Sequence, residues 1–161
     1  FLEHEIKQSL ARLTKQMLAH VIIAYEPLWA IGKDATRPAT ASEFLEMIIF
    51  IRKVLADMFG KKQAFAVPII YGGSVDHRNA KEFLDVAGSS GLLVGRASLE
   101  PKLFEQILPD CGPLRSRLYS LLAIPVEASA TLPPHIFAYI PNPDIFLNFP
   151  VQVYSINPSL F

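Results

Sequence analysis

Apolar residues in the first two thirds of the chain follow two alternating patterns. In one pattern they recur every three or four residues, as Ile6, Leu10, Leu13 and Met17 do, which is typical of a helix with one buried face. In the other they form short unbroken runs, which indicate strands buried on both faces, as in a parallel sheet. The helices are predicted over residues 3–18, 42–58, 79–86 and 101–108. The strands are predicted over residues 21–25, 67–71 and 92–94.

The order of these segments predicts the fold class. Strands joined by helices favour parallel pairing with right-handed crossovers, and therefore an α/β fold. Both a doubly wound sheet and an eight-stranded barrel are built from this unit, and the spacing of apolar residues does not separate them. Two of the helix starts carry the residue pair of a capping box, Thr40 with Glu43 and Asn79 with Glu82.

The composition changes sharply near Pro109. Residues 1–108 carry 25 of the 30 charged side chains, whereas residues 109–161 carry five of them and nine of the 13 prolines. We therefore predict two parts, an α/β part over 1–108 and a proline-rich apolar tail over 109–161. Within the tail, residues 118–126 have the pattern of a brief helix or strand, and residues 136–140 and 151–154 have the pattern of short strands.

Charge and composition exclude several classes of protein. The 15 basic and 15 acidic residues give a formal net charge of zero, so the chain has no electrostatic footprint for nucleic acid. A single cysteine, Cys111, excludes a disulfide framework and a CxxC zinc site. No apolar run approaches the roughly 18 residues of a transmembrane helix. These observations predict a soluble, intracellular protein that binds neither nucleic acid nor a membrane.

Candidate chemistry follows the end of each predicted strand. Glu26 comes directly after the first strand, and glycine turns follow the second at residues 72–74 and the third at residues 95–96. Ligands of parallel α/β folds bind beyond the carboxyl ends of the strands. A desolvated carboxylate there is a better base, while an ion pair or a helix cap would make Glu26 a structural residue. The apolar segment 27–32 fits either a lid that excludes water or core and a turn.

The two glycine turns have two interpretations as well. Bare backbone N–H groups near a helix start suit a phosphate group. Glycine also simply permits a tight turn between a strand and a helix. Two such turns on consecutive strands favour the phosphate site, because barrels repeatedly build one from the loops after strands seven and eight.

Three segments resemble one known family. Residues 24–32 (AYEPLWAIG) look like the signature of triosephosphate isomerase, and residues 71–75 (YGGSV) and 93–99 (LVGRASL) resemble the family's seventh- and eighth-strand motifs. The resemblance covers residues 3–108, from helix five through helix eight of the family's (β/α)8 barrel. It implies a partial barrel made of strands six to eight with their flanking helices, followed by the unrelated tail.

The resemblance also implies an activity and a set of site residues. The family interconverts dihydroxyacetone phosphate and glyceraldehyde 3-phosphate in glycolysis and gluconeogenesis, as a cytoplasmic homodimer without a cofactor or metal. Glu26 would be the base that moves a proton through an enediolate intermediate. The phosphate group would be held by backbone amides of Gly32, Ser74, Gly95 and Arg96. The lid over the intermediate would be formed by Pro27, Leu28, Trp29, Ala30, Ile31, Gly32 and Lys33.

Several family features differ or lie outside the resemblance. Lys33 and Asp34 follow Gly32 where the lid commonly continues Gly-Thr-Gly, and Arg96 stands where many members have a second glycine. The family's lysine and histidine come from its first and fourth strands, so a chain that begins after the fifth carries neither. His77 follows the second strand, and we expect it to be an exposed loop residue. Three strands also leave open edges, which favour association.

Three functional hypotheses therefore stand beside one another. The first is an isomerase seen as a fragment, whose isolated activity is not expected. The second is a non-catalytic phosphate-binding or interaction module that uses its tail for a partner. The third is a different sugar-phosphate barrel enzyme, which the intact segment 25–32 argues against. The contradictory composition of the tail, too rich in proline for core and too apolar for a linker, favours a truncated or frameshifted product over a docking extension.

Overall fold

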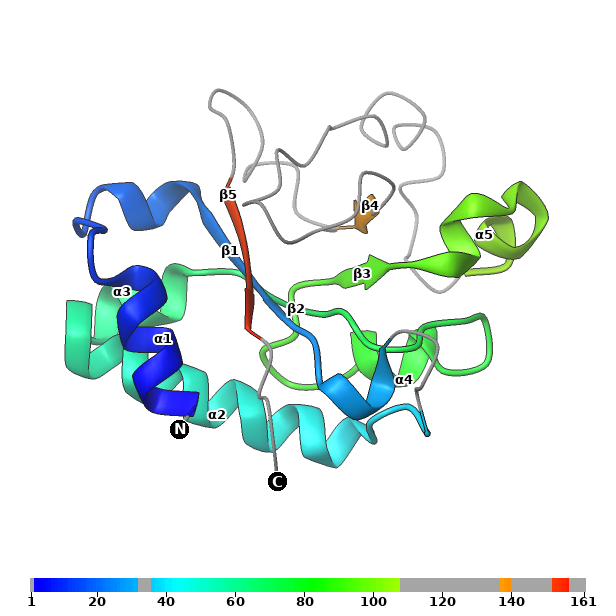
Figure 1. Ribbon diagram of the computed structural model, residues 1–161, viewed down its shortest axis with the longest axis horizontal. Coiled ribbons are helices and arrows are strands. Elements are labelled where there is room, and N and C mark those ends of the chain that lie inside the picture. Colours follow the sequence, from blue (N-terminus) through cyan, green and yellow to red (C-terminus); the bar gives the residue numbers. More distant parts are fainter. Residues whose placement is uncertain (1, 32–35, 108–136, 140–151, 157–161) are drawn as a thin grey trace.

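The computed structural model describes residues 2–31, 36–107, 137–139 and 152–156 (Figure 1). These residues form an α/β fold around a five-stranded sheet with the strand order β4-β3-β2-β1-β5. The strands are β1 (Val21–Tyr25), β2 (Ile69–Tyr71), β3 (Leu92–Val94), β4 (Phe137–Tyr139) and β5 (Gln152–Ile156). The neighbours β1, β2 and β3 pair in parallel, β5 pairs in parallel with β1, and β4 pairs antiparallel with β3.

Most of the helices lie on one side of this sheet. Figure 1 shows α2 running below the strands, with α1 and α3 near one of its ends and α4 near the other. The described α-helices are α1 (Leu2–Leu10), α2 (Ala41–Phe59), α3 (Lys61–Ala66), α4 (Ala80–Leu84) and α5 (Pro101–Ile107). Three short 3-10 helices join them to the strands: η1 (Met17–His20), η2 (Leu28–Ala30) and η3 (Arg96–Leu99). Among the described residues, no helix is long and apolar enough to cross a membrane.

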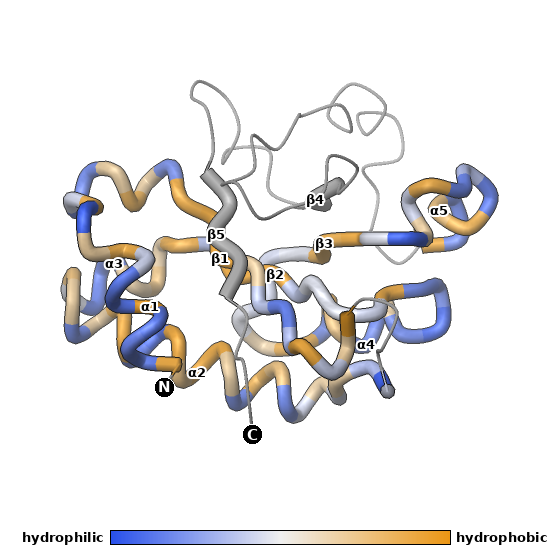
Figure 2. The backbone as a smooth tube through the Cα atoms, in the orientation of Figure 1, coloured by the Kyte–Doolittle hydropathy of each residue, from blue (hydrophilic) through white to orange (hydrophobic). Residues whose placement is uncertain are grey.

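The central strands are buried on both faces, as their unbroken apolar runs predicted. On the helix side, alternate strand residues pack into one core with α2 and α4, and Phe44 lies at the centre of an aromatic group with Tyr25, Tyr71 and Phe83. The residues that alternate with them are at most 1% exposed and lie outside that core: Ile22, Ala24, Ile70 and Leu93. In Figure 2, α2 alternates between hydrophobic and hydrophilic segments, as expected of a helix with one buried side.

The helix predicted over 42–58 is confirmed together with its start. Glu43 N–H donates to Thr40 Oγ1 at 3.2 Å, and Thr40 N–H donates to Glu43 Oε2 at 2.7 Å, which is a complete capping box. Arg37 adds an ion pair to Glu43 at 2.6 Å. The pKa of Glu43 is lowered to about 2, chiefly by the hydrogen bond from Arg37 and then by the one from the Thr40 backbone.

The long helix predicted over 3–18 is wrong in its second half. The helix α1 ends at Leu10, and the apolar spacing continues into the separate 3-10 helix η1. Thr14 lies at the break, where its hydroxyl accepts a hydrogen bond from Met17 N at 3.3 Å. Threonine hydroxyls offer the backbone an alternative to continued α-helix, and this competing bond overrides the apolar periodicity.

The second predicted capping box is also wrong. Asn79 precedes α4 but makes no side-chain cap, because its amide is used elsewhere. Asn79 Oδ1 accepts from Asp76 N at 2.9 Å, and Asn79 Nδ2 donates to Ser74 O at 2.9 Å. The side chain therefore braces the loop that follows β2.

The short helix α3 has no counterpart among the predicted elements. Gly60 separates it from α2 with a φ of 94°, a conformation that favours glycine. Arg52 reaches from α2 to the end of α3, where its guanidinium donates to Ala64 O and, at 2.5 Å, to Val67 O. Burial lowers the pKa of Arg52. These bonds satisfy carbonyls at the end of α3, which its own backbone leaves without partners.

Two strands outside residues 1–108 pair with the edges of β1 and β3, which were expected to be open. The tail segment predicted over 136–140 contains β4, and the segment predicted over 151–154 overlaps β5, which extends to Ile156. These strands pair with the free edges of β3 and β1. The three-stranded unit is thus flanked by strands of its own chain. The segment 118–126 and Cys111 lie outside the described residues.

Candidate functional site

The three sequence segments singled out above lie at one end of the sheet. Because β1, β2 and β3 are neighbours and run in the same direction, their carboxyl ends meet at the same edge. Glu26 follows β1, Ser74 lies in the turn after β2, and Gly95 and Arg96 follow β3. The structure therefore brings these predicted residues to one edge. Gly32 and Lys33 lie outside the described residues.

Glu26 is held at the end of β1 against the turn after β2. Its residue is 8% exposed, and it is the one charged residue classed as buried in the described part of the chain. Gly72 N–H donates to Tyr25 O at 2.9 Å, which fixes the turn beside it. A Cβ on Gly72 would lie 2.6 Å from Glu26 Cγ and 3.0 Å from Oε1. The side chain of Glu26 thus packs against the Cα of Gly72 and takes the space that a Cβ would need there.

The segment after Glu26 begins as the 3-10 helix η2 and is tied to the same turn. Ser74 Oγ donates to Ala30 O at 2.7 Å, and Thr36 N–H donates to Trp29 O at 2.9 Å. Ala30 is buried, whereas Leu28 is 41% exposed. The indole Nε1 of Trp29 is buried and has no acceptor among the described residues. The predicted lid therefore starts from an anchored turn, and Ser74 holds that turn through its side chain.

A second hydrogen bond joins the turn after β2 to the segment that follows Glu26. It involves Tyr71, which was not predicted from the sequence to be a functional residue. Ala39 N–H donates to Tyr71 Oη at 3.1 Å, and the ring of Tyr71 stacks on Phe83 with centroids 3.8 Å apart. Burial raises the pKa of Tyr71 to about 12, so its hydroxyl stays protonated at neutral pH. A Cβ on Gly73 would lie 2.0 Å from Tyr71 Oη. The position of Tyr71 directly before two glycines is the signal that marks it.

The hydrogen bonds from Ser74 and Tyr71 hold the two ends of the segment from Ala30 to Ala39. Ser74 holds its start at Ala30 and Tyr71 holds its end at Ala39, so both bonds come from the turn at the end of β2. Directly after Ala39, the capping box of Thr40 and Glu43 starts α2. Both Ala30 and Ala39 are therefore fixed to the turn that follows β2.

The turn after β3 is built differently. Ser98 donates to Gly95 O from its backbone N–H at 2.9 Å and from its hydroxyl at 2.7 Å, which starts the 3-10 helix η3. A Cβ on Gly95 would meet no atom of the described residues within 4 Å, and Arg96 is exposed. Within the described part of the chain, this turn therefore has open space at its glycine.

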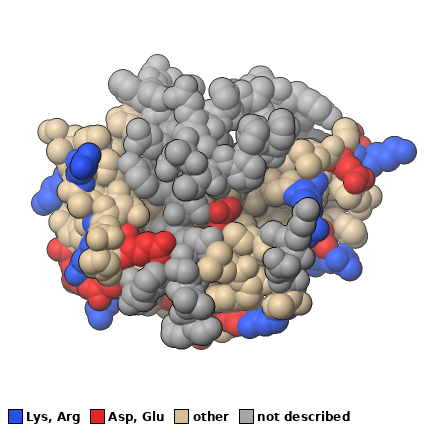
Figure 3. All heavy atoms as spheres, viewed as in Figure 1, with Lys and Arg blue, Asp and Glu red and all other residues tan. Residues whose placement is uncertain are grey.

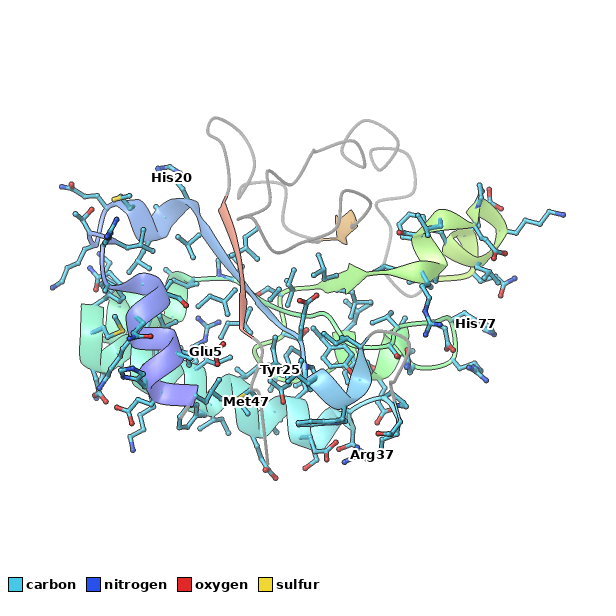
Figure 4. The ribbon with its side chains drawn as sticks, in the orientation of Figure 1. Glu5, His20, Tyr25, Arg37, Met47 and His77 are labelled. Carbon is cyan, nitrogen blue, oxygen red and sulfur yellow. The ribbon has the colours of Figure 1, made fainter. Side chains whose placement is uncertain are left out.

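The loop between β2 and α4 is ordered by its own polar side chains. Arg78 pairs with Asp76, whose pKa is lowered chiefly by this bond, and Asn79 braces Ser74 O. His77 is exposed, as predicted, and Figure 4 shows it pointing away from the strands. No group of three or more histidine, cysteine, aspartate or glutamate side chains in the described part of the chain could hold a metal ion. Figure 3 shows charges of both signs around the described surface.

Comparisons with known proteins converge on one family. A sequence model described as triosephosphate isomerase matches residues 1–111. The triosephosphate isomerase of Dehalococcoides mccartyi is 41% identical over 114 residues, which is 71% of this chain and 43% of that protein. The enzyme of Chlamydia abortus is 44% identical over 109 residues, which is 68% of this chain and 41% of that protein. The chain spans less than half the length of these relatives. The matched residues include all three strand ends, from Glu26 to Arg96, and the chain belongs to the triosephosphate isomerase family.

Proposed function

We propose that these residues form the carboxyl-terminal part of the catalytic barrel of a triosephosphate isomerase. The reaction is the interconversion of dihydroxyacetone phosphate and glyceraldehyde 3-phosphate by proton transfer through an enediolate. In this proposal β1, β2 and β3 are strands six, seven and eight of the barrel. The whole protein would be a cytoplasmic homodimer that serves glycolysis and gluconeogenesis.

The observation that carries the proposal is the burial of Glu26 at the carboxyl end of β1. Its side chain is nearly enclosed and rests on Gly72 at the edge where parallel α/β folds bind ligands. A carboxylate removed from water abstracts a proton from a weak carbon acid better than a solvated one does. We therefore propose that Glu26 is the catalytic base.

The remaining site residues receive matching roles. Open space at Gly95 supports a phosphate site formed by the backbone N–H groups of Gly95 and Arg96, and Ser74 would add a third N–H group. The segment from Pro27 to Lys33 would close over the enediolate and exclude water. The lysine and histidine that would stabilise the intermediate belong to other strands of the family's barrel. We therefore expect no turnover by the 161-residue chain alone.

A chimaera tests the proposal directly. Residues 1–111 replace the aligned 43% of the Dehalococcoides mccartyi isomerase, and the rate of isomerisation is measured. We expect an active chimaera whose kcat falls about 10²–10⁴-fold on Glu26→Gln, the usual contribution of a general base. His77→Ala is the matched control, because His77 lies exposed in the loop after β2. A folded chimaera without activity, or one unaffected by Glu26→Gln, would overturn the assignment.

The open turn at Gly95 also supports a second candidate, a phosphate-binding module without catalysis. Its test is the melting temperature of the 161-residue chain with and without inorganic phosphate, together with an isomerase assay. A ligand that binds only the folded state raises the melting temperature by mass action. Stabilisation without turnover by either the chain or the chimaera would favour this candidate over the isomerase.

A further inference from the structure

The strand β1 carries Glu26 and is paired along both of its edges. Its partner on one edge is β2, which the family match covers. Its partner on the other edge is β5, which lies beyond the matched residues 1–111. The β5 pairing is the more extensive one, with a register that runs from Val21 opposite Gln152 to Tyr25 opposite Ile156.

The backbone of β1 shows which groups face which neighbour. Ile23 N–H donates to Pro68 O at 3.0 Å, and Tyr25 O accepts from Gly72 N at 2.9 Å, so these residues point towards β2. Polar groups of successive residues in a strand point to opposite sides, so those of Ile22 and Ala24 point towards β5. Without a strand at this edge, two buried residues of β1 would lose their backbone partners, which is costly.

We propose that β5 is an intramolecular substitute strand, which fills the edge of β1 that the rest of a barrel would otherwise pair with. An eight-stranded barrel closes only when each strand has two neighbours, and a three-stranded piece of it has two open edges. In this chain the edge of β1 already has its parallel partner. Another strand can pair with this edge of β1 only by displacing β5. The edge is therefore a docking surface for one strand, and residues 152–156 of the same chain occupy it.

The direction of β5 connects this surface with the candidate site. Because β5 runs parallel to β1, its carboxyl end lies at the same edge as Glu26, and Ile156 pairs with Tyr25, the residue before Glu26. A strand that replaced β5 in the same direction would bring its own carboxyl end beside Glu26. The exchange of one strand for another would thus change the surroundings of the proposed base. The inference concerns pairing at the edge and does not depend on isomerase activity.

The first test uses the unmodified chain and measures backbone amide exchange by NMR. The N–H groups of Ile23 and Tyr25 face β2, and those of Ile22 and Ala24 face β5. We expect all four to exchange at least about 100-fold slower than an unprotected amide, as ladder amides do. Fast exchange of Ile22 and Ala24, with Ile23 and Tyr25 protected, would show that β5 does not occupy the edge and would overturn the inference.

The second test empties the edge by a single substitution. In the observed register Tyr154 N–H points towards β1, whereas Ser155 N–H points away from it. Proline has no N–H, so Tyr154→Pro removes a ladder bond and Ser155→Pro does not. Tyr154→Ala controls for the loss of the side chain, because it keeps the N–H group. Circular dichroism confirms that each variant is folded before it is used.

The probe is a fluorescent peptide with the sequence of residues 151–157, VQVYSIN, and its binding is followed by anisotropy. We expect the Tyr154→Pro chain to bind the peptide at least about tenfold more tightly than the unmodified chain, because its edge is vacant. Ser155→Pro and Tyr154→Ala should behave as the unmodified chain does. Equal binding by all four chains would contradict the inference. If Tyr154→Pro does not fold, the exchange pattern of the unmodified chain decides the question.

Discussion

The two glycine turns of the candidate site look alike in sequence and differ in how they are packed. At the end of β2, a Cβ on Gly72 would collide with Glu26, and one on Gly73 would collide with Tyr71. At the end of β3, a Cβ on Gly95 would meet no atom of the described residues within 4 Å. The first turn needs glycine because side chains of its own chain fill the space. At the second turn, no side chain of the described residues fills the space, so packing among them does not require glycine.

Glycine can occur at a candidate phosphate site for two structural reasons. It makes room for a side chain of the same chain, or it leaves room for a ligand. In the β2 turn, glycine lets two side chains take their places, Glu26 at the strand end and Tyr71 against Ala39 N. In the β3 turn, the described residues leave the space next to the backbone of Gly95 open, as required where a ligand approaches closely. Substitution at the first turn should therefore change stability, and substitution at the second should change ligand binding. Three glycine substitutions test this contrast, and a fourth substitution tests the charge at the start of α2. The expected loss of stability decreases from Gly73 to Gly95.

The largest effect is expected for Gly73→Ala. The new Cβ would lie 2.0 Å from Tyr71 Oη and 2.4 Å from Cζ, so the ring must move away from Phe83 and from Ala39 N. Overpacking of this kind and one lost hydrogen bond together cost about 3 kcal/mol of unfolding free energy. Urea denaturation measures the loss. Tyr71→Phe is the control, since it should lose only the hydrogen bond, about 1 kcal/mol.

Gly72→Ala should be the next most damaging change, at about 2 kcal/mol, because Glu26 must leave its place to admit a methyl group. A double-mutant cycle with Glu26→Ala isolates this contact. In the Glu26→Ala background the clashing atoms are gone, so Gly72→Ala should cost much less in urea denaturation. The same cost in both backgrounds would mean that Gly72 is constrained by something other than Glu26.

A smaller effect, present at neutral pH and lost at low pH, is expected from Glu43, which lies at the start of α2 close to the hydrogen bond between Tyr71 and Ala39. Its pKa is about 2 in the folded chain, below its ordinary value of 4.5, chiefly because Arg37 bonds to it. A carboxylate with a lowered pKa stabilises the fold above pH 4.5, and this contribution disappears as the pH falls towards 2. Glu43→Gln keeps a capping partner and removes the charge. It should cost below about 1 kcal/mol at pH 7 and much less at pH 2. An equal difference between the two chains at both pH values would exclude this role of the charge.

The smallest effect on stability is expected at the open turn. A Cβ on Gly95 would have no atom of the described residues within 4 Å, so a methyl group fits there without a clash. Gly95→Ala should therefore change the unfolding free energy by less than about 0.5 kcal/mol. In the active chimaera, the same substitution should raise the KM for dihydroxyacetone phosphate, because the methyl group takes space proposed for the phosphate. An unchanged KM would remove Gly95 from the phosphate site.

Local signals in the sequence predicted much of the fold. The helix over 42–58 was predicted with its capping box, because Thr40 and Glu43 satisfy each other without distant help. The three unbroken apolar runs were also predicted as strands from the local sequence alone, because a strand buried on both faces needs apolar residues at every position. The helix over 3–18 failed at Thr14, where one hydroxyl outweighs the apolar spacing. Asn79 failed as a cap because its amide bonds to Asp76 and Ser74 in the adjacent loop.

The sequence predicted that the candidate residues follow the strand ends, but it did not predict the contacts between them. Glu26, Ser74, Gly95 and Arg96 follow strand ends, a position that sequence order alone provides. The tie between Tyr71 and Ala39 joins residues that are 32 positions apart, and no local pattern encodes such a pairing. The same holds for Ser74, whose hydroxyl bonds to Ala30 O although only its backbone had been assigned a role. Contacts between distant side chains depend on the packed fold, which periodicity does not specify.

The pairing of β5 with β1 has a consequence for the order of events during synthesis. Val21 leaves the ribosome more than a hundred residues before its partner Gln152. At roughly 5–20 residues per second, the edge of β1 waits about 7–26 seconds for its partner. Throughout that interval an apolar parallel strand has one unpaired side, which is the state in which nascent chains associate. Yield in the cell should therefore depend on the speed of translation between β1 and β5, and on chaperones that cover the edge until β5 emerges.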